Sequence, residues 1–143
     1  MIELRKCRAE DFEGVMALLA QLWPGKPLDP MGLRNVYNRA LASDRQLYLC
    51  ALDGQQVVGF GSLAIKANLW SEAFVGFVDE MVVDEAHRGQ GIGSQILGQL
   101  TIWAREHGCN RIELDSAFHR KGAHAFYERH GFQSRGYLFS KLL

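Results

Sequence analysis

The sequence predicts an α/β protein with a mixed sheet of about six to seven strands flanked by about four helices. Segments with apolar residues at helical spacing alternate along the chain with segments that have the pattern of strands. Their order is a strand, two helices, three strands, a helix, a strand, a helix and one or two closing strands. The 143 residues are 48% hydrophobic and contain no linker-like tract, so we expect a single domain over residues 1–143.

The first elements are a short strand at 2–5 and two helices. Asp11 is expected to cap the first helix, and Pro30 to precede the second. The residues of the first helix that face the core at helical spacing are Phe12, Val15, Met16, Leu18, Leu19 and Leu22. The second helix carries the apolar residues Leu33, Val36, Tyr37 and Leu41. The segment 23–27, with two prolines and a glycine, indicates a loop between them.

Three strands are predicted in the middle of the chain. Residues 46–52 and 56–65 form strands joined by a tight Asp53-Gly54 turn, and 73–83 forms a strand after a loop at 66–71. A helix from Ile92 to Gly108 follows, and a strand at 111–115 makes it a crossover between two parallel strands.

The end of the chain is predicted to hold a short helix and the closing strands. The helix covers 121–130 and is closed by Gly131. Residues 132–143 are expected to contain one or two strands.

The overall composition argues against nucleic-acid and membrane partners. Sixteen basic residues balance sixteen acidic ones, so the chain has no net field to hold it on a polyanion. No apolar run approaches the length of a membrane span. The three cysteines form no CxxC pair, which favours free, buried thiols and a cytoplasmic location.

The most informative motif is a glycine-rich loop between a predicted strand and a predicted helix, Arg88-Gly89-Gln90-Gly91-Ile92-Gly93. Backbone N–H groups at such a helix start can hold a pyrophosphate, and glycine allows the phosphate to come close. No Gly-Lys-Ser/Thr is present, so a P-loop is excluded. A dinucleotide fingerprint starting at Gly91 would need glycine where Ile96 stands, which leaves a dinucleotide-binding protein as a weaker alternative.

This loop resembles the Arg/Gln-x-x-Gly-x-Gly/Ala signature of the GNAT superfamily of acetyl-CoA-dependent N-acetyltransferases. A second segment, 123–132, is similar to the family's Ala-x-x-x-Tyr-x-x-x-Gly-Phe pattern, and the resemblance covers nearly the whole chain. It implies acetyl-CoA as cosubstrate and transfer of its acetyl group to a small-molecule primary amine by direct attack through a tetrahedral intermediate. The cofactor-binding residues that it implies are Met81, Val82, Val83, Arg88, Gly89, Gln90, Gly91, Ile92, Gly93, Ser94 and Tyr127. Residues 119–127 and 136–141 look like the aminoalkylphosphonate and aminoglycoside N-acetyltransferase branch.

The resemblance also implies catalytic roles for two residues. Glu80, an acid in an apolar strand, is the candidate base for the amine, although a structural acid is the alternative and a strand bulge could exchange its role with Asp79. Tyr127 matches the tyrosine that protonates the leaving thiolate; the alternative is a packed aromatic. A backbone N–H of Met81 or Val82 could stabilise the oxyanion. Many relatives carry Asn where this chain has Arg120.

The acceptor is left open by the sequence. Its pocket is expected around 22–28, 66–72 and 115–116, with Trp23, Trp70, Glu80 and Ser116 as substrate-binding candidates. Lys26 or Lys66 would favour an anionic amine, whereas an acidic surround would favour a polyamine or aminoglycoside. No metal site is predicted from histidine spacing. The alternative function is a non-catalytic acetyl-CoA sensor, and relatives suggest a homodimer.

Overall fold

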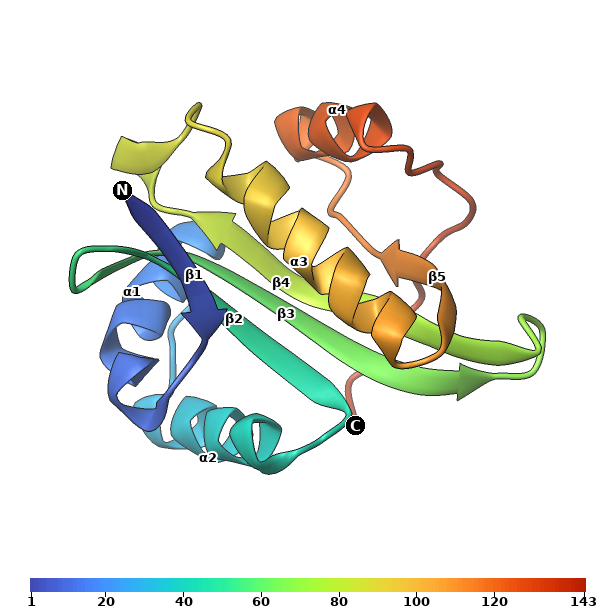
Figure 1. The fold of residues 1–143 in the computed structure, drawn as a ribbon, viewed down its shortest axis with the longest axis horizontal. Helices are drawn as coiled ribbons and strands as arrows, with labels where there is room; N and C mark the ends of the chain where they lie inside the picture. The colour runs from blue at the N-terminus through green and yellow to red at the C-terminus, as the bar shows by residue number, and fades with distance from the viewer. The chain divides into compact units, whose positions relative to one another are not determined.

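The computed structural model describes residues 1–143, which form two compact units, Met1–Glu113 and Leu114–Leu143. The first contains a sheet with strand order β1-β2-β3-β4-β5 (Figure 1). The strands are β1 (Ile2–Lys6), β2 (Gln46–Asp53), β3 (Gln56–Asn68), β4 (Ala73–Val83) and β5 (Cys109–Leu114, whose last residue begins the second unit). β1 to β4 pair antiparallel in sequence order, and Figure 1 shows β5 running in the same direction as β4, so the sheet is mixed.

Three α-helices cover the two faces of this sheet. α1 (Phe12–Leu22) and α2 (Pro30–Ala42) pack on one face, where Phe12 and Tyr37 join Phe60 and Val82 of the strands in one apolar cluster. α3 (Ile92–Glu106) crosses the other face, over β3 and β4 (Figure 1). Gly61 permits its close approach, because a Cβ there would lie 2.5 Å from Ile96 Cγ2.

The β2–β3 turn lies one residue later than the sequence predicts. Asp53 pairs with Gln56, so the two loop residues are Gly54 and Gln55, and Gly54 takes the positive φ of 62° that such a hairpin turn requires. β3 also extends to Asn68, through the first half of the predicted loop.

One prediction for the helices is only half right. Asp11 stands at the N-cap position of α1, but its side chain makes no capping hydrogen bond, because its carboxylate accepts hydrogen bonds from the Arg5 guanidinium and the Arg8 backbone N–H. In α2, Tyr37 and Ala40 are buried, whereas Val36 is 60% exposed.

The sheet has five strands, fewer than the predicted six to seven. Residues 132–143 form no strand, although one or two closing strands are predicted there. A strand needs a hydrogen-bonding neighbour, and this segment pairs with no strand of the sheet. Its large apolar side chains are exposed: Tyr137, Leu138, Phe139, Leu142 and Leu143.

The second unit contains α4 (Lys121–Arg129), which ends before Gly131 at a φ of 89°. The Tyr127 ring packs against Phe126 and Phe132. Gly131 therefore turns the chain so that Phe132 returns onto the helix, where its N–H bonds to the Tyr127 carbonyl.

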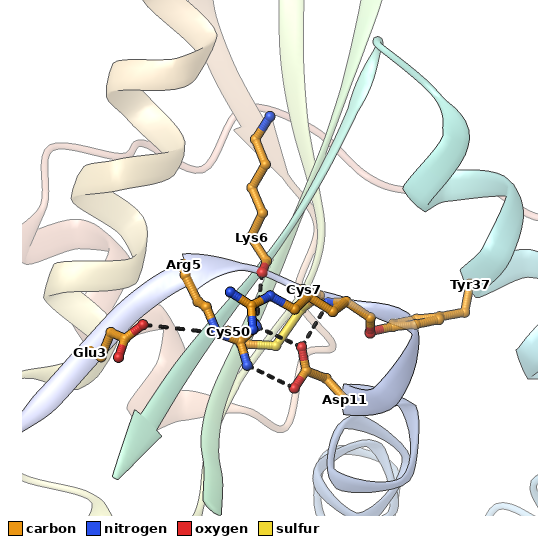
Figure 2. The surroundings of a disulfide bond; sticks show 8 residues. Glu3, Arg5, Lys6, Cys7, Asp11, Tyr37 and Cys50 are labelled. Carbon is orange, nitrogen blue, oxygen red and sulfur yellow. Dashed lines mark hydrogen bonds and ion pairs between the residues drawn. A yellow bond between two sulfur atoms is a disulfide. The ribbon is translucent and has the colours of Figure 1, made fainter. Parts of the chain in front are cut away.

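The cysteines differ from the expectation of three free thiols. Cys7 and Cys50 are buried, as predicted, but they form a disulfide that joins the end of β1 to the neighbouring strand β2 (Figure 2). No local pattern indicates this pair, because it is strand pairing that brings these two residues, 43 apart along the chain, into contact. Cys109 is a free thiol.

No helix in the structure combines the length and the apolar character needed to cross a membrane.

Candidate functional site

Glu80 lies at an irregularity in the pairing of β3 with β4. Gly61 pairs with Met81 and Leu63 pairs with Val78, so Ser62 alone faces both Asp79 and Glu80. The Ser62 hydroxyl accepts the Glu80 backbone N–H at 2.9 Å and donates to its Oε1 at 2.7 Å. Such a β-bulge re-aims a side chain, and here the local bonds hold the Glu80 carboxylate in one position.

The surroundings of Glu80 favour a carboxyl group that binds protons more readily than usual. Burial raises its pKa, the Ser62 hydrogen bond lowers it, and the charge of Asp79 raises it further, with a net upward shift. Burial, with the charges of Glu80 and Asp79, also raises the pKa of Tyr48 to about 12. Glu80 is thus a stronger base than a surface glutamate, and Tyr48 stays neutral beside it.

Glu80 belongs to the lining of a pocket in the first unit, which we call the Glu80 pocket. It has a volume of about 70 Å³. Its lining combines five aromatic rings, four aliphatic side chains and a single charged group: Phe12, Trp23, Tyr37, Tyr48, Phe60, Val15, Leu19, Leu33, Val36 and Glu80. These lining residues come from α1, from the residue after it, from α2 and from strands β2 to β4.

The glycine-rich loop has the backbone geometry that binding a pyrophosphate requires. Gly89 and Gly91 take φ values of 79° and 81°, and nothing lies within 4 Å of where their Cβ atoms would be. Gly91 is the N-cap of α3, so the loop leads directly to the free N–H groups of that helix. The loop therefore leaves room for a phosphate group to approach the backbone at the start of α3.

A hydrogen-bonded cluster that the sequence analysis did not identify holds the start of this loop. Asp84, just after β4, accepts a bond from Gln21 Nε2 of α1 at 2.8 Å and contacts His87 Nδ1 at 2.9 Å. His87 Nε2 lies 3.3 Å from Asp53 at the end of β2. In the sequence, only the position of His87 beside the loop motif could have indicated its role. Its partners Asp53 and Asp84 lie 34 and 3 residues away along the chain.

A larger hollow of about 310 Å³ lies beside this cluster, lined by α1 and the β2–β3 turn. Asp84 and Gln21 belong to its wall, but Glu80 does not. Of these two hollows, only the smaller one contains Glu80.

Tyr127 is half-buried in the second unit. Burial raises the pKa of its hydroxyl, against a lowering by the nearby Arg120, so the phenol is protonated at neutral pH. A proton donor needs this state.

The substrate-binding candidates fall in different places. Trp23 lines the Glu80 pocket. Trp70, 71% exposed in the β3–β4 turn, does not line it and instead packs under the guanidinium of Arg111. Ser116 lies in the second unit, in the coil between β5 and α4, and Arg120 precedes α4 there. The structure gathers no three His, Cys, Asp or Glu side chains into a group suited to a metal ion.

Comparison with known proteins connects this geometry to a family. The model of the acetyltransferase (GNAT) family matches residues 10–132, which include β4, the glycine-rich loop and α4. The chain is 35% identical to an aminoalkylphosphonate N-acetyltransferase of Salmonella typhimurium, over 99% of this chain and 91% of that protein. It is 30% identical to a glucosamine 6-phosphate N-acetyltransferase of Trypanosoma brucei brucei, over 93% of this chain and 90% of that protein.

The fold is also that of solved acetyltransferases. One is an aminoglycoside N-acetyltransferase in complex with CoA, which superposes with a TM-score of 0.86 over 99% of this chain and 95% of that one, at 20% identity. The chain therefore belongs to the acetyltransferase (GNAT) family, and it is an acetyl-CoA-dependent N-acetyltransferase.

Proposed function

We propose that this enzyme acetylates the primary amine of a small acceptor held in the Glu80 pocket, with Glu80 as the base. The observation that carries the proposal is the Glu80 carboxylate itself. It is fixed by Ser62 at a bulge, has a raised pKa, and is the one charged group in a pocket of otherwise apolar and aromatic side chains. A general base must lie within reach of the proton that it removes, and this pocket provides that contact.

The steps of the reaction follow from the residues around the pocket and the loop. Acetyl-CoA supplies the acetyl group as an activated thioester. Amides of the loop 88–94 hold its pyrophosphate, and the backbone of 81–83 lines its arm and polarises the carbonyl. Glu80 takes a proton from the acceptor's ammonium group, and the nitrogen lone pair that this frees then forms the C–N bond. Tyr127 gives a proton to the CoA sulfur as the C–S bond breaks, so that amide and CoA thiol are the products.

The identity of the acceptor is narrowed by the names of the relatives. An aminoalkylphosphonate, glucosamine 6-phosphate and an aminoglycoside are the first acceptors to test, since proteins similar to this chain are named for them. We also propose that both compact units serve one acetyltransferase domain, because the family model spans both.

We also propose a cytoplasmic location and a homodimer. The free thiol of Cys109 is consistent with the cytoplasm, whereas the Cys7–Cys50 disulfide is a bond that cytosolic proteins rarely keep, so thiol labelling in intact cells is the decisive measurement. Exposed apolar residues at the C-terminal end, Tyr137 to Phe139, support a homodimer, to be measured by light scattering.

The test of the catalytic roles is a CoA-release assay with these acceptors. Glu80→Gln is expected to lower kcat/KM by about 10²–10⁴-fold while acetyl-CoA still binds. Tyr127→Phe is expected to lower kcat. Asp79→Asn is the matched control, because it removes the adjacent acid. If Asp79→Asn lost as much activity as Glu80→Gln, the assignment of the base to Glu80 would be wrong.

A further inference from the structure

The shape and polarity of the Glu80 pocket indicate which part of an acceptor molecule binds inside it. We propose that it binds the acceptor as an ammonium on an unsubstituted alkyl stem of about three to four carbons, an inference that rests on the proposed function. Any polar or charged head group of the acceptor then lies outside the pocket. This selects aminoalkyl compounds over amines whose neighbouring carbons carry hydroxyl groups.

The size of the pocket sets the length of the stem. Each water-sized group needs roughly 10–15 Å³ of such a cavity, so its volume of about 70 Å³ holds about five groups. One is the nitrogen beside Glu80. Phe60, 1% exposed, belongs to the buried floor of the pocket, whereas Val36, 60% exposed, marks its rim.

The pocket offers polar atoms to the ammonium and almost none to the stem. The Tyr37 hydroxyl donates to the Arg8 carbonyl at 2.7 Å and is already satisfied. Glu80 uses Oε1 for Ser62, which leaves Oε2 for the ligand, and Tyr48 has the remaining hydroxyl. Hydroxyl groups on the stem would find only the Tyr48 hydroxyl as a partner, so a stem with several of them would lose more water contacts than the pocket replaces.

The charges and rings favour a cation at this one place. Tyr37, Tyr48 and Phe60 form a continuous series of ring contacts, with centroids 5.5 and 5.2 Å apart, and the series reaches the wall that Glu80 closes. Aromatic rings attract an ammonium ion, and both Glu80 and Asp79 act electrostatically on Tyr48. The same two carboxylates would repel an anionic group on the carbon next to the amine.

An amino sugar presents the opposite pattern to this pocket. The amine of glucosamine 6-phosphate is attached to a ring carbon between hydroxyl-bearing neighbours. The trypanosomal relative is named for that substrate and is 30% identical to this chain. The lining of the Glu80 pocket nevertheless favours a different kind of amine. We therefore expect the two enzymes to differ in acceptor.

The experiment compares kcat/KM for n-butylamine, its equal-sized analogue 2-methoxyethylamine, and glucosamine 6-phosphate. Butylamine is expected to exceed both by about tenfold or more, since hydroxyl or ether oxygens lose water on entering a pocket whose walls are almost entirely apolar and aromatic. Equal or better use of glucosamine 6-phosphate, with turnover still dependent on Glu80, would overturn this inference and leave the proposed function intact. Turnover of no amine would overturn the proposed function itself.

A pair of variants on α2 provides the structural control. Val36→Trp narrows the rim and is expected to lower kcat/KM for butylamine by about tenfold or more while sparing methylamine. Met31→Trp introduces the same side chain at a position on α2 that is 79% exposed and outside the pocket, and it should change neither. Equal losses for both amines in Val36→Trp would contradict the proposed position of the stem.

Discussion

The pKa of Glu80 depends on two neighbours that act in opposite directions. The Ser62 hydroxyl stabilises the charged carboxylate and lowers its pKa, whereas the charge of Asp79 destabilises it and raises its pKa. Burial has the largest effect and raises it. A base acts when deprotonated, so kcat/KM should rise with pH through this raised pKa and then level off.

Because the two neighbours act on the pKa of Glu80 in opposite directions, replacing each of them should shift the pH–rate profile in opposite directions. Ser62→Ala removes the stabilising bond, so the acid limb of the pH–rate profile should move to higher pH. Asp79→Asn removes the repelling charge, so the limb should move to lower pH. The measurement is kcat/KM for one amine at saturating acetyl-CoA between about pH 5 and 9. Shifts of the same sign in both variants would show that another group controls the limb.

At the scale of elements, the turn from β4 into α3 is held from two sides. Asp84 binds Gln21 of α1, and His87 contacts both Asp84 and Asp53 at the end of β2. The Asp84 hydrogen bond is the main cause that raises the pKa of His87, and bonds from Gln21 and His87 lower the pKa of Asp84. The cluster thus ties the start of the glycine-rich loop to helix α1 and to strands β2 and β4.

The direction of each pKa shift determines how the stability that this cluster contributes depends on pH. Because the folded pKa of His87 is raised, its contribution to stability is fully present below about pH 6.5 and is lost as pH rises through the raised value. The Asp84 contribution is lost only as pH falls through its lowered pKa. His87→Gln should therefore reduce the free energy of unfolding more at about pH 5.5 than at about pH 9.

Urea unfolding at the two pH values checks this prediction. His107→Gln, at the other end of α3, is the control for replacing a histidine whose ring bonds to the Trp103 carbonyl and stacks on the Trp103 ring. A destabilisation by His87→Gln that is the same at both pH values would mean that the imidazole acts by packing and not by charge. The KM for acetyl-CoA should rise in His87→Gln, since the loop loses a support.

At the scale of the molecule, the sequence predicted local features and missed those that join distant residues. Helical spacing placed α1, α2 and α3, and the glycine-rich loop pointed to the diphosphate site, because these depend on neighbouring residues. The bond of Ser62 to Glu80 spans 18 residues and that of Gln21 to Asp84 spans 63, so no local pattern contains them. The prediction of closing strands was wrong for the same reason, since the apolar residues of a segment can suit a strand without showing that a partner strand is present.

The Cys7–Cys50 disulfide is the longest-range covalent feature of the molecule and affects its stability as a whole. It closes a loop over 43 residues that includes α1 and α2, beside the Arg5–Asp11 ion pair at 2.7 Å (Figure 2). Such a bond limits the unfolded chain, so adding a reductant should lower the free energy of unfolding by about 2–4 kcal/mol. The check is urea unfolding with and without dithiothreitol. Cys7→Ala serves as the control, because its stability should not respond to the reductant; an equal midpoint for the wild-type protein in both conditions would show that its cysteines are reduced throughout.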